Sequence, residues 1–142
     1  MDYVALKTEL QADPNGLGYA AAIASGSDNI LANLLNAVNQ NINITRDILK
    51  AYEIFDAVDP TDYSGLTAAK KTDLQLILGM GEVDVLNANT RSLLAGIFGA
   101  GSATRTALLA LQNRKGSRAE QLFGRGVFVT AADIAIALRG AS

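Results

Sequence analysis

Apolar residues recur at helical spacing along most of the chain. Tyr3, Leu6 and Leu10 indicate a first helix over residues 2–12, whose free N–H groups Asp2 can cap. A clearer stripe begins at Ile30, where apolar residues follow at alternating intervals of one and three up to Val38. Similar patterns, each opened by a capping residue or a glycine, predict further helices over residues 18–25, 45–58, 67–79, 87–98, 102–123 and 130–138.

Short polar or glycine-rich stretches separate these helices. Asp13-Pro14 ends the first one, because a residue before proline is pushed out of the α region. Residues 39–43 form a polar break, and residues 59–65 form the next corner. Residues 126–129 combine glycine with valines, which indicates a short extended segment. The predicted fold is therefore all-α: a single helical domain over residues 1–142, built as a compact bundle of about six helices with one extended segment near residues 126–129.

Composition limits the chemistry of the chain. Its 142 residues are 49% apolar and only 6% aromatic, a balance that suits closely packed helices. The sequence has no cysteine and no histidine, so it offers neither a disulfide framework nor the commonest general base and zinc ligand. Asp2 stands where a secretory signal would have basic residues, and no apolar run reaches the roughly 20 residues of a membrane span. We expect a soluble protein without a membrane partner.

Two glycine-rich stretches come close to anion-binding motifs. Gly16 and Gly18 lack the third glycine or the lysine of phosphate-binding loops, and they follow a helix, so a turn is the better interpretation. Gly99 and Gly101, with Gly96 before them, resemble an anion-binding nest ahead of a helix. A helix end followed by a new N-cap at Ser102 is the favoured interpretation of that stretch.

Acidic residues gather at two corners, around Pro60 and after Gly81. Asp56, Asp59 and Asp62 are spaced by three rather than by two, so they do not match a calcium-binding loop of the EF-hand type. Glu82 and Asp84 are too far along the chain to complete such a loop. The plentiful serines and threonines have no histidine to activate them. We therefore predict that the protein is not an enzyme, and we assign no catalytic residue, no cofactor and no metal site.

Charge is distributed unevenly along the chain. Residues 1–90 hold 5 Lys/Arg and 12 Asp/Glu, whereas residues 91–142 hold 7 and 2. An acidic first part and a basic last part would give the protein complementary faces if they lay apart in space. The main candidates for an interaction are basic residues of the predicted long helix and of the loop after it: Arg105, Arg114, Lys115, Arg118 and Arg125. They suit nucleic acid, the acidic part of a neighbouring copy, or a merely solvated helix face. A second candidate is the extended segment, which can pair with a partner's strand edge or act as a local linker: Val127, Phe128 and Val129.

Several stretches of the sequence resemble small proteins from the structural gene modules of tailed bacteriophages. They are Asp2 to Leu10, Asp13-Pro14, Gly18-Tyr19, Asn33 to Asn36, Phe98 to Ser102, Ser117 to Glu120 and Gly126 to Val129. Among virion proteins, a compact helical chain of this size is most similar to the head–tail adaptor, which forms a ring beneath the portal. The resemblance contains no catalytic residues.

This resemblance implies a structural role in a virion that is assembled in the host cytoplasm. The protein would form a homo-oligomeric ring, bind the portal and the tail or stopper proteins, and extend the channel through which DNA passes without sequence-specific binding. A ring needs one face of each subunit to meet a different face of the next. Two alternatives stay open: a small helical nucleic-acid-binding protein that uses residues 105–125, and another virion role such as capsid decoration.

Overall fold

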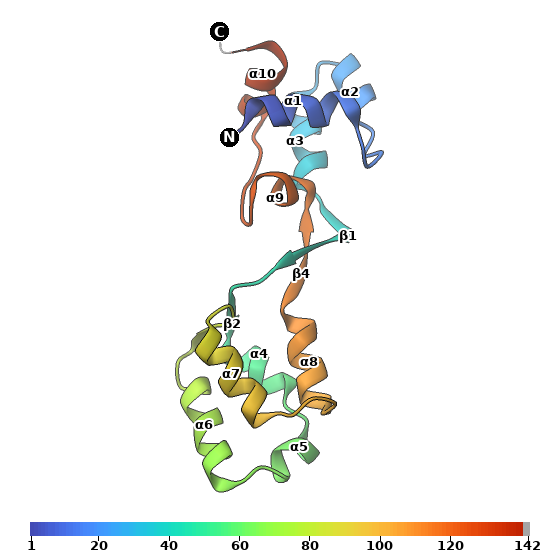
Figure 1. Ribbon diagram of the computed structural model, residues 1–142. Coiled ribbons are helices and arrows are strands. Elements are labelled where there is room, and N and C mark those ends of the chain that lie inside the picture. The colour runs from blue at the N-terminus through green and yellow to red at the C-terminus, as the bar shows by residue number, and fades with distance from the viewer. Residues whose placement is uncertain (141–142) are drawn as a thin grey trace. The chain divides into compact units, whose positions relative to one another are not determined.

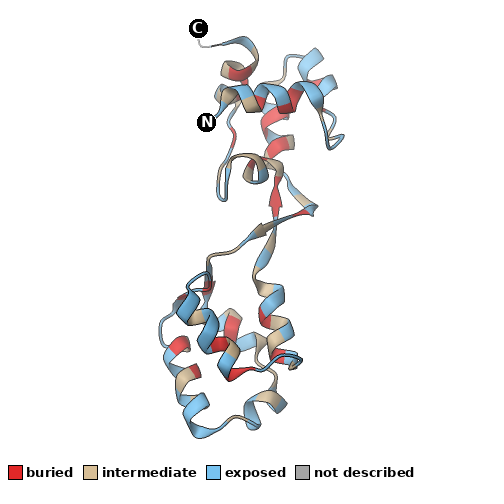
Figure 2. Ribbon diagram, in the orientation of Figure 1, coloured by how far each residue is buried: buried red, intermediate tan, exposed pale blue. Residues whose placement is uncertain are grey.

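The structure, a computed structural model, describes residues 1–140 (Figure 1). The chain divides into two compact units. We call residues 45–114 the central unit, and residues 1–44 together with the chain from residue 115 onward the terminal unit. Each has its own cluster of buried apolar side chains, as the distribution of buried positions in Figure 2 shows. The prediction that residues 1–142 form one domain stays a prediction.

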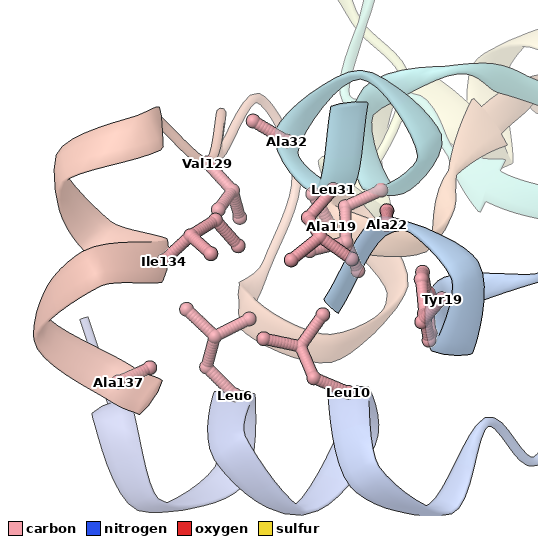
Figure 3. Packing of buried hydrophobic residues seen from close by; sticks show 11 residues of the cluster. Leu6, Leu10, Tyr19, Ala22, Leu31, Ala32, Ala119, Val129, Ile134 and Ala137 are labelled. Carbon is pink, nitrogen blue, oxygen red and sulfur yellow. The ribbon is translucent and has the colours of Figure 1, made fainter. Parts of the chain in front are cut away.

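The terminal unit brings the two ends of the chain together. Its helices are α1 (Tyr3–Ala12), α2 (Tyr19–Ala24), α3 (Asp28–Asn36), α9 (Arg118–Phe123) and α10 (Ala131–Arg139). Strands β1 (Val38–Thr45) and β4 (Asn113–Ser117), most of whose residues belong to this unit, form a two-stranded sheet. Leu6 and Leu10 of α1 point into a core shared with Leu31 of α3 and Ile134 of α10 (Figure 3). Leu6 and Ile134 are both fully buried, so residues far apart in sequence hold this unit together.

The first corner of the terminal unit is built around Asp13. This residue ends α1 with a left-handed backbone, φ 41°, and its N–H donates to the Glu9 carbonyl oxygen at 2.9 Å. Its carboxylate then accepts hydrogen bonds from the N–H groups of Leu17, Gly18 and Tyr19, at 2.7, 2.8 and 3.3 Å. One side chain therefore closes the first helix and positions the start of α2.

The central unit combines five helices with a small sheet. The helices are α4 (Ala51–Ala57), α5 (Pro60–Ser64), α6 (Ala68–Leu78), α7 (Ala88–Ile97) and α8 (Ala103–Leu111). Strands β2 (Ile48–Lys50) and β3 (Glu82–Asp84) pair antiparallel, with Leu49 opposite Val83. These two side chains are 2% and 1% exposed, and they join a core that contains Ile54, Ile77 and Phe98.

The predicted all-α class is wrong. The structure is 59% helical and 14% strand, and residues 1–140 contain ten helices and two small antiparallel sheets instead of a bundle of about six helices. The stretch 39–43, expected to be a polar break, belongs to β1. Residues 41–44 of this strand alternate asparagine with Ile42 and Ile44, and Ile42 is the one residue of β1 that is buried. Because its partner strand lies about 70 residues further along the chain, no local signal identified it as paired.

Two predicted helices are each broken by a strand. The helix expected from Thr45 begins only at Ala51, after β2, and the Glu53 side chain accepts from the Lys50 N–H at 2.9 Å at its start. The helix expected over residues 102–123 ends at Leu111, gives way to β4, and resumes as α9. The extended segment near residues 126–129 contains no strand; residues 125–126 form a turn, and the chain then runs without regular structure to α10.

Candidate functional site

The five basic candidates do not share one helix face, because β4 interrupts the predicted helix. Arg105 lies on α8 and Arg114 on β4, both in the central unit. Lys115 on β4, Arg118 on α9 and Arg125 in the turn after α9 belong to the terminal unit. The Lys115 ammonium group donates to the Asn43 side chain of β1 at 2.9 Å. A continuous basic stripe, on which the nucleic-acid alternative depended, is therefore not formed within any one element; the role of these residues in binding a partner stays a prediction.

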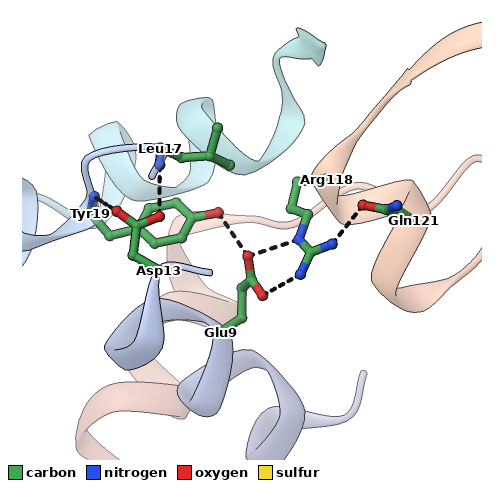
Figure 4. Close-up of polar contacts among 6 residues, drawn as sticks. All are labelled: Glu9, Asp13, Leu17, Tyr19, Arg118 and Gln121. Carbon is green, nitrogen blue, oxygen red and sulfur yellow. Dashed lines mark hydrogen bonds and ion pairs between the residues drawn. The ribbon is translucent and has the colours of Figure 1, made fainter. Parts of the chain in front are cut away.

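Arg118 is held by a buried ion pair inside the terminal unit (Figure 4). Its Nε and Nη2 atoms donate to the two carboxylate oxygens of Glu9 at 2.8 and 2.7 Å, and Nη1 donates to Gln121 at 2.6 Å. The Glu9 side chain is 4% exposed and that of Arg118 is 15% exposed. The hydrogen bonding that Arg118 donates to the Glu9 carboxylate raises the pKa of Arg118, so the guanidinium stays charged. This ion pair connects α9 to α1, and it engages the Arg118 guanidinium within the terminal unit.

The Tyr19 hydroxyl completes this network. It donates to Glu9 Oε1 at 3.3 Å, and its ring is fully buried. Burial, and after it the charge of Glu9, raises the pKa of Tyr19 well above its usual value. Glu9, Tyr19 and Arg118 therefore form a polar network within an apolar core. Each buried polar side-chain atom of the network has a hydrogen-bond partner, which fixes its geometry.

Folding removes the charge asymmetry of the sequence. The basic end of the chain folds against its acidic beginning: Arg118 pairs with Glu9, and Arg139 pairs with Asp28. The terminal unit then holds 5 Lys/Arg and 6 Asp/Glu, and the central unit holds 7 and 8. Each unit has a net charge of −1, so the order of charges along the chain does not produce an acidic unit and a basic unit.

The three residues of the proposed extended segment have different surroundings. Val129 is fully buried, its N–H donates to Asn36 Oδ1 at 2.9 Å, and its carbonyl oxygen accepts from Asn36 Nδ2 at 2.6 Å. Both backbone groups of Val129 are thus used inside the unit, and they are not offered to a partner strand. Val127 is half-buried, whereas Phe128 is 67% exposed. Of this segment, Phe128 is the side chain that the surface presents.

The glycine-rich stretches serve the fold. At residues 16–18 the N–H groups that an anion would need are already used, which leaves the corner interpretation. The Gly16 N–H donates to the Asp13 carbonyl oxygen, and the N–H groups of Leu17 and Gly18 donate to the Asp13 carboxylate. Burial alone would raise the pKa of Asp13, but the three backbone donors together outweigh it and hold this pKa below its usual value. At the second stretch, the Ser102 hydroxyl accepts from the Arg105 N–H at 3.1 Å and caps α8.

Most of the clustered acids have partners within the fold. Asp59 caps α5, and Asp62 accepts from the Thr104 N–H at 2.8 Å. Glu82 pairs with Lys50, and Asp84 accepts from the backbone N–H groups of residues 86 and 87. Among residues 1–140, no three His, Cys, Asp or Glu side chains are grouped so that they could hold a metal ion.

An apolar groove on the central unit is the surface that the sequence patterns did not reveal. It has a volume of about 630 Å³ and lies among α4, α5 and α6. Its lining is apolar except for Asp56 and Gln75, and consists otherwise of Phe55, Val58, Pro60, Tyr63, Leu74 and Leu78. Phe55 is 64% exposed and Tyr63 is 39% exposed, whereas Leu74 at the base is buried. The Lys71 ammonium group lies 4.8 Å from the centre of the Tyr63 ring, within the range of a cation–π contact.

In the helix that the sequence predicts over residues 45–58, helical spacing places Phe55 on one apolar face with Ile48, Leu49, Tyr52 and Val58, and so predicts that Phe55 faces the core. Strand β2 breaks that stripe, and Ile54 is the residue of α4 that is buried, so Tyr52 and Phe55 are left at the surface. The sequence signal for this arrangement is Ile54, an apolar residue of α4 that shares a core with Leu74 and Ile77 of α6. That signal can be interpreted only once α4 and α6 are known to pack together.

No helix within residues 1–140 combines the length and the apolar character needed to cross a membrane. No known protein family, no curated protein and no solved structure matches this chain.

Proposed function

We propose that this chain is a non-enzymatic structural protein of a tailed-bacteriophage virion, most specifically a head–tail adaptor that forms a ring between portal and tail. Two independent lines support the proposal. The first is the resemblance of its opening residues and of the Phe98 to Ser102 segment to phage structural proteins. The second is an exposed apolar groove of the kind that assembling proteins use.

The groove carries the proposal. Two aromatic side chains, Phe55 and Tyr63, border a hollow whose base is apolar. Large exposed apolar surfaces are uncommon on proteins that act alone, and aromatic residues are enriched where protein interfaces are buried. Asp56 is the single charged residue of the lining. The groove therefore has the character of an interface core and lacks the convergent polar groups of a catalytic pocket.

Another exposed aromatic side chain, Phe128, belongs to the terminal unit. A ring of identical subunits requires two different surfaces on each copy, because a head-to-tail contact joins two unlike patches. A subunit stacked between other proteins also needs more than one surface. The groove and the loop that carries Phe128, residues 124–130, are two such unlike patches on one chain. They support an assembling subunit with more than one contact, and they serve equally for contact with a second copy, with a portal or with a tail protein.

The experiment compares two exposed aromatic residues of the same helix. Phe55 lines the groove, whereas Tyr52, 65% exposed on α4, does not. The purified full chain is studied by native mass spectrometry, alone and with the portal protein encoded in the same genome. Wild type and Tyr52→Ser should form the homo-oligomer or the portal complex, and Phe55→Ser should lose it, with all three equally folded by circular dichroism.

Three results would count against this assignment. A wild-type chain that stays monomeric and leaves the portal unbound would remove the adaptor role. If instead Phe55→Ser assembles as well as Tyr52→Ser does, the groove is not the interface. Binding to the capsid protein in place of the portal would identify the decoration role and reject the adaptor.

A further inference from the structure

A second, smaller pocket of the central unit has a different chemistry from the groove. It lies between α7 and α8, with a volume of about 250 Å³. Its apolar lining includes side chains that are at most 9% exposed: Leu49, Val85, Leu94 and Leu108. Its polar lining comes from the two helices, with Arg91 and Ser92 on α7 and Arg105 and Gln112 at α8. All of these residues belong to one unit, so their arrangement is fixed by its core.

The two arginines of this pocket are not neutralised by carboxylates. No acidic residue lines the pocket. Arg105 donates through Nη1 to the Phe98 carbonyl oxygen at 3.2 Å, which orients the guanidinium without cancelling its charge. The Arg91 side chain has no hydrogen bond or ion pair with the residues of the described chain. By contrast, the arginines at positions 46, 118 and 139 each pair with a carboxylate.

This arrangement places positive charge at an apolar hollow in a unit whose net charge is −1. A guanidinium donates two parallel hydrogen bonds to a carboxylate, and such charged pairs are stronger than neutral ones. The apolar side chains can at the same time remove a hydrocarbon group from water. A ligand that satisfies both features carries an anionic head and a short apolar body.

We propose that the pocket between α7 and α8 binds a carboxylate attached to a small apolar group, with Arg91 and Arg105 holding the carboxylate and Leu49, Leu94 and Leu108 holding the apolar part. Its volume lies below the roughly 300–1,000 Å³ of pockets for drug-sized ligands, so it suits a few carbon atoms and not a nucleotide. Two sources present this chemistry: the carboxyl-terminal residue of a protein and a free short-chain aliphatic acid. The proposal does not depend on the virion role.

The test titrates the full-length protein, labelled with ¹⁵N, with hexanoate and follows its amide signals. Hexanoate should produce saturable shifts at residues of α7 and α8. Hexan-1-ol lacks the charge, and acetate lacks the chain, so both should bind at least about tenfold more weakly. Acetyl-glycyl-leucine with a free carboxylate and its amide identify the source: tighter binding of the free dipeptide than of hexanoate points to a protein terminus, and the reverse order points to a free aliphatic acid.

The variant Arg91→Gln should weaken hexanoate binding roughly tenfold, because it removes one charged donor and leaves the apolar lining of the pocket intact. Lys70→Gln, an exposed lysine of α6 outside the pocket, makes the same change of charge and should bind as wild type does. Both positions are exposed, and unchanged amide dispersion would confirm their folds.

The proposal is overturned if neither hexanoate nor the free dipeptide gives saturable shifts in the wild-type protein. It is also overturned if acetate or inorganic phosphate binds as tightly as hexanoate, since attraction of any anion would then suffice. Binding of hexan-1-ol as tight as that of hexanoate would show that the arginines do not hold the ligand. Wild-type affinity for hexanoate in Arg91→Gln would also overturn the role of the arginines.

Discussion

At the scale of single residues, Asp13 shows how one carboxylate can organise a corner. It adopts a left-handed backbone, and it accepts from the N–H groups of residues 17, 18 and 19. Three donors to one carboxylate stabilise its charged form, which outweighs the cost of its burial and lowers its pKa. The glycines that resembled a phosphate-binding loop thus surround an anion that the chain itself provides.

This geometry predicts how acid affects stability. Because the pKa of Asp13 is lower in the folded state, its stabilising contribution is complete above the unfolded pKa of about 3.9, and is lost as the pH falls through the folded pKa. Asp13→Asn should unfold at lower urea concentration at neutral pH. The difference from wild type should shrink as the pH falls below about 4.

Urea titrations at a series of pH values measure this difference. Asn15→Ala, an exposed change in the same turn that removes no titrating group, should keep the wild-type pH dependence. A constant difference between Asp13→Asn and wild type at every pH would show that the carboxylate charge does not stabilise the corner.

Several residue-level predictions succeeded where the chemistry is local, although Thr45, predicted to cap a helix, lies in β1. Asp2, Thr67, Asn87, Ser102 and Thr130 all cap the helices that follow them, as the sequence predicted. A capping side chain bonds to N–H groups only two or three residues away, so the sequence contains the whole interaction. The Glu9–Arg118 pair spans 109 positions, and no local pattern connects its partners.

At the scale of elements, the strands are what the sequence did not reveal. Helical spacing identified most helices, but β1 and β4 are largely polar, and each depends on a partner far along the chain. In the helix that the sequence predicts over residues 102–123, Gly116 is a weak point. In the structure it lies buried in β4, where a Cβ atom would come within 2.2 Å of Ile44 Cγ1 on β1. The glycine therefore permits the close approach of two strands.

Gly116→Ala should consequently destabilise the protein by about 1–3 kcal/mol, because the added methyl group clashes with a branched side chain near its root. Gly96 provides the matched control. It is exposed within α7, a Cβ there would meet nothing within 4 Å, and Gly96→Ala should stabilise the protein by up to about 1 kcal/mol. Chemical denaturation measures both changes. Equal effects of the two substitutions would mean that β1 and β4 do not approach each other closely at Gly116.

At the scale of the whole molecule, the candidate site depends on features that only the folded chain has. The basic residues were visible in the sequence, but the ion pairs that engage Arg118 and Arg139 were not. The groove needs α4, α5 and α6 to be packed so that Ile54 is buried and Phe55 is not. Composition and the absence of histidine pointed away from catalysis, yet they could not locate a binding surface.

The proposed virion role is tested most directly by mass spectrometry of purified phage particles produced from the genome that encodes this chain. We predict that its peptides are present in the particles, at a copy number comparable with that of the portal protein and far below that of the major capsid protein. Absence of the chain from infectious particles would contradict the proposed function.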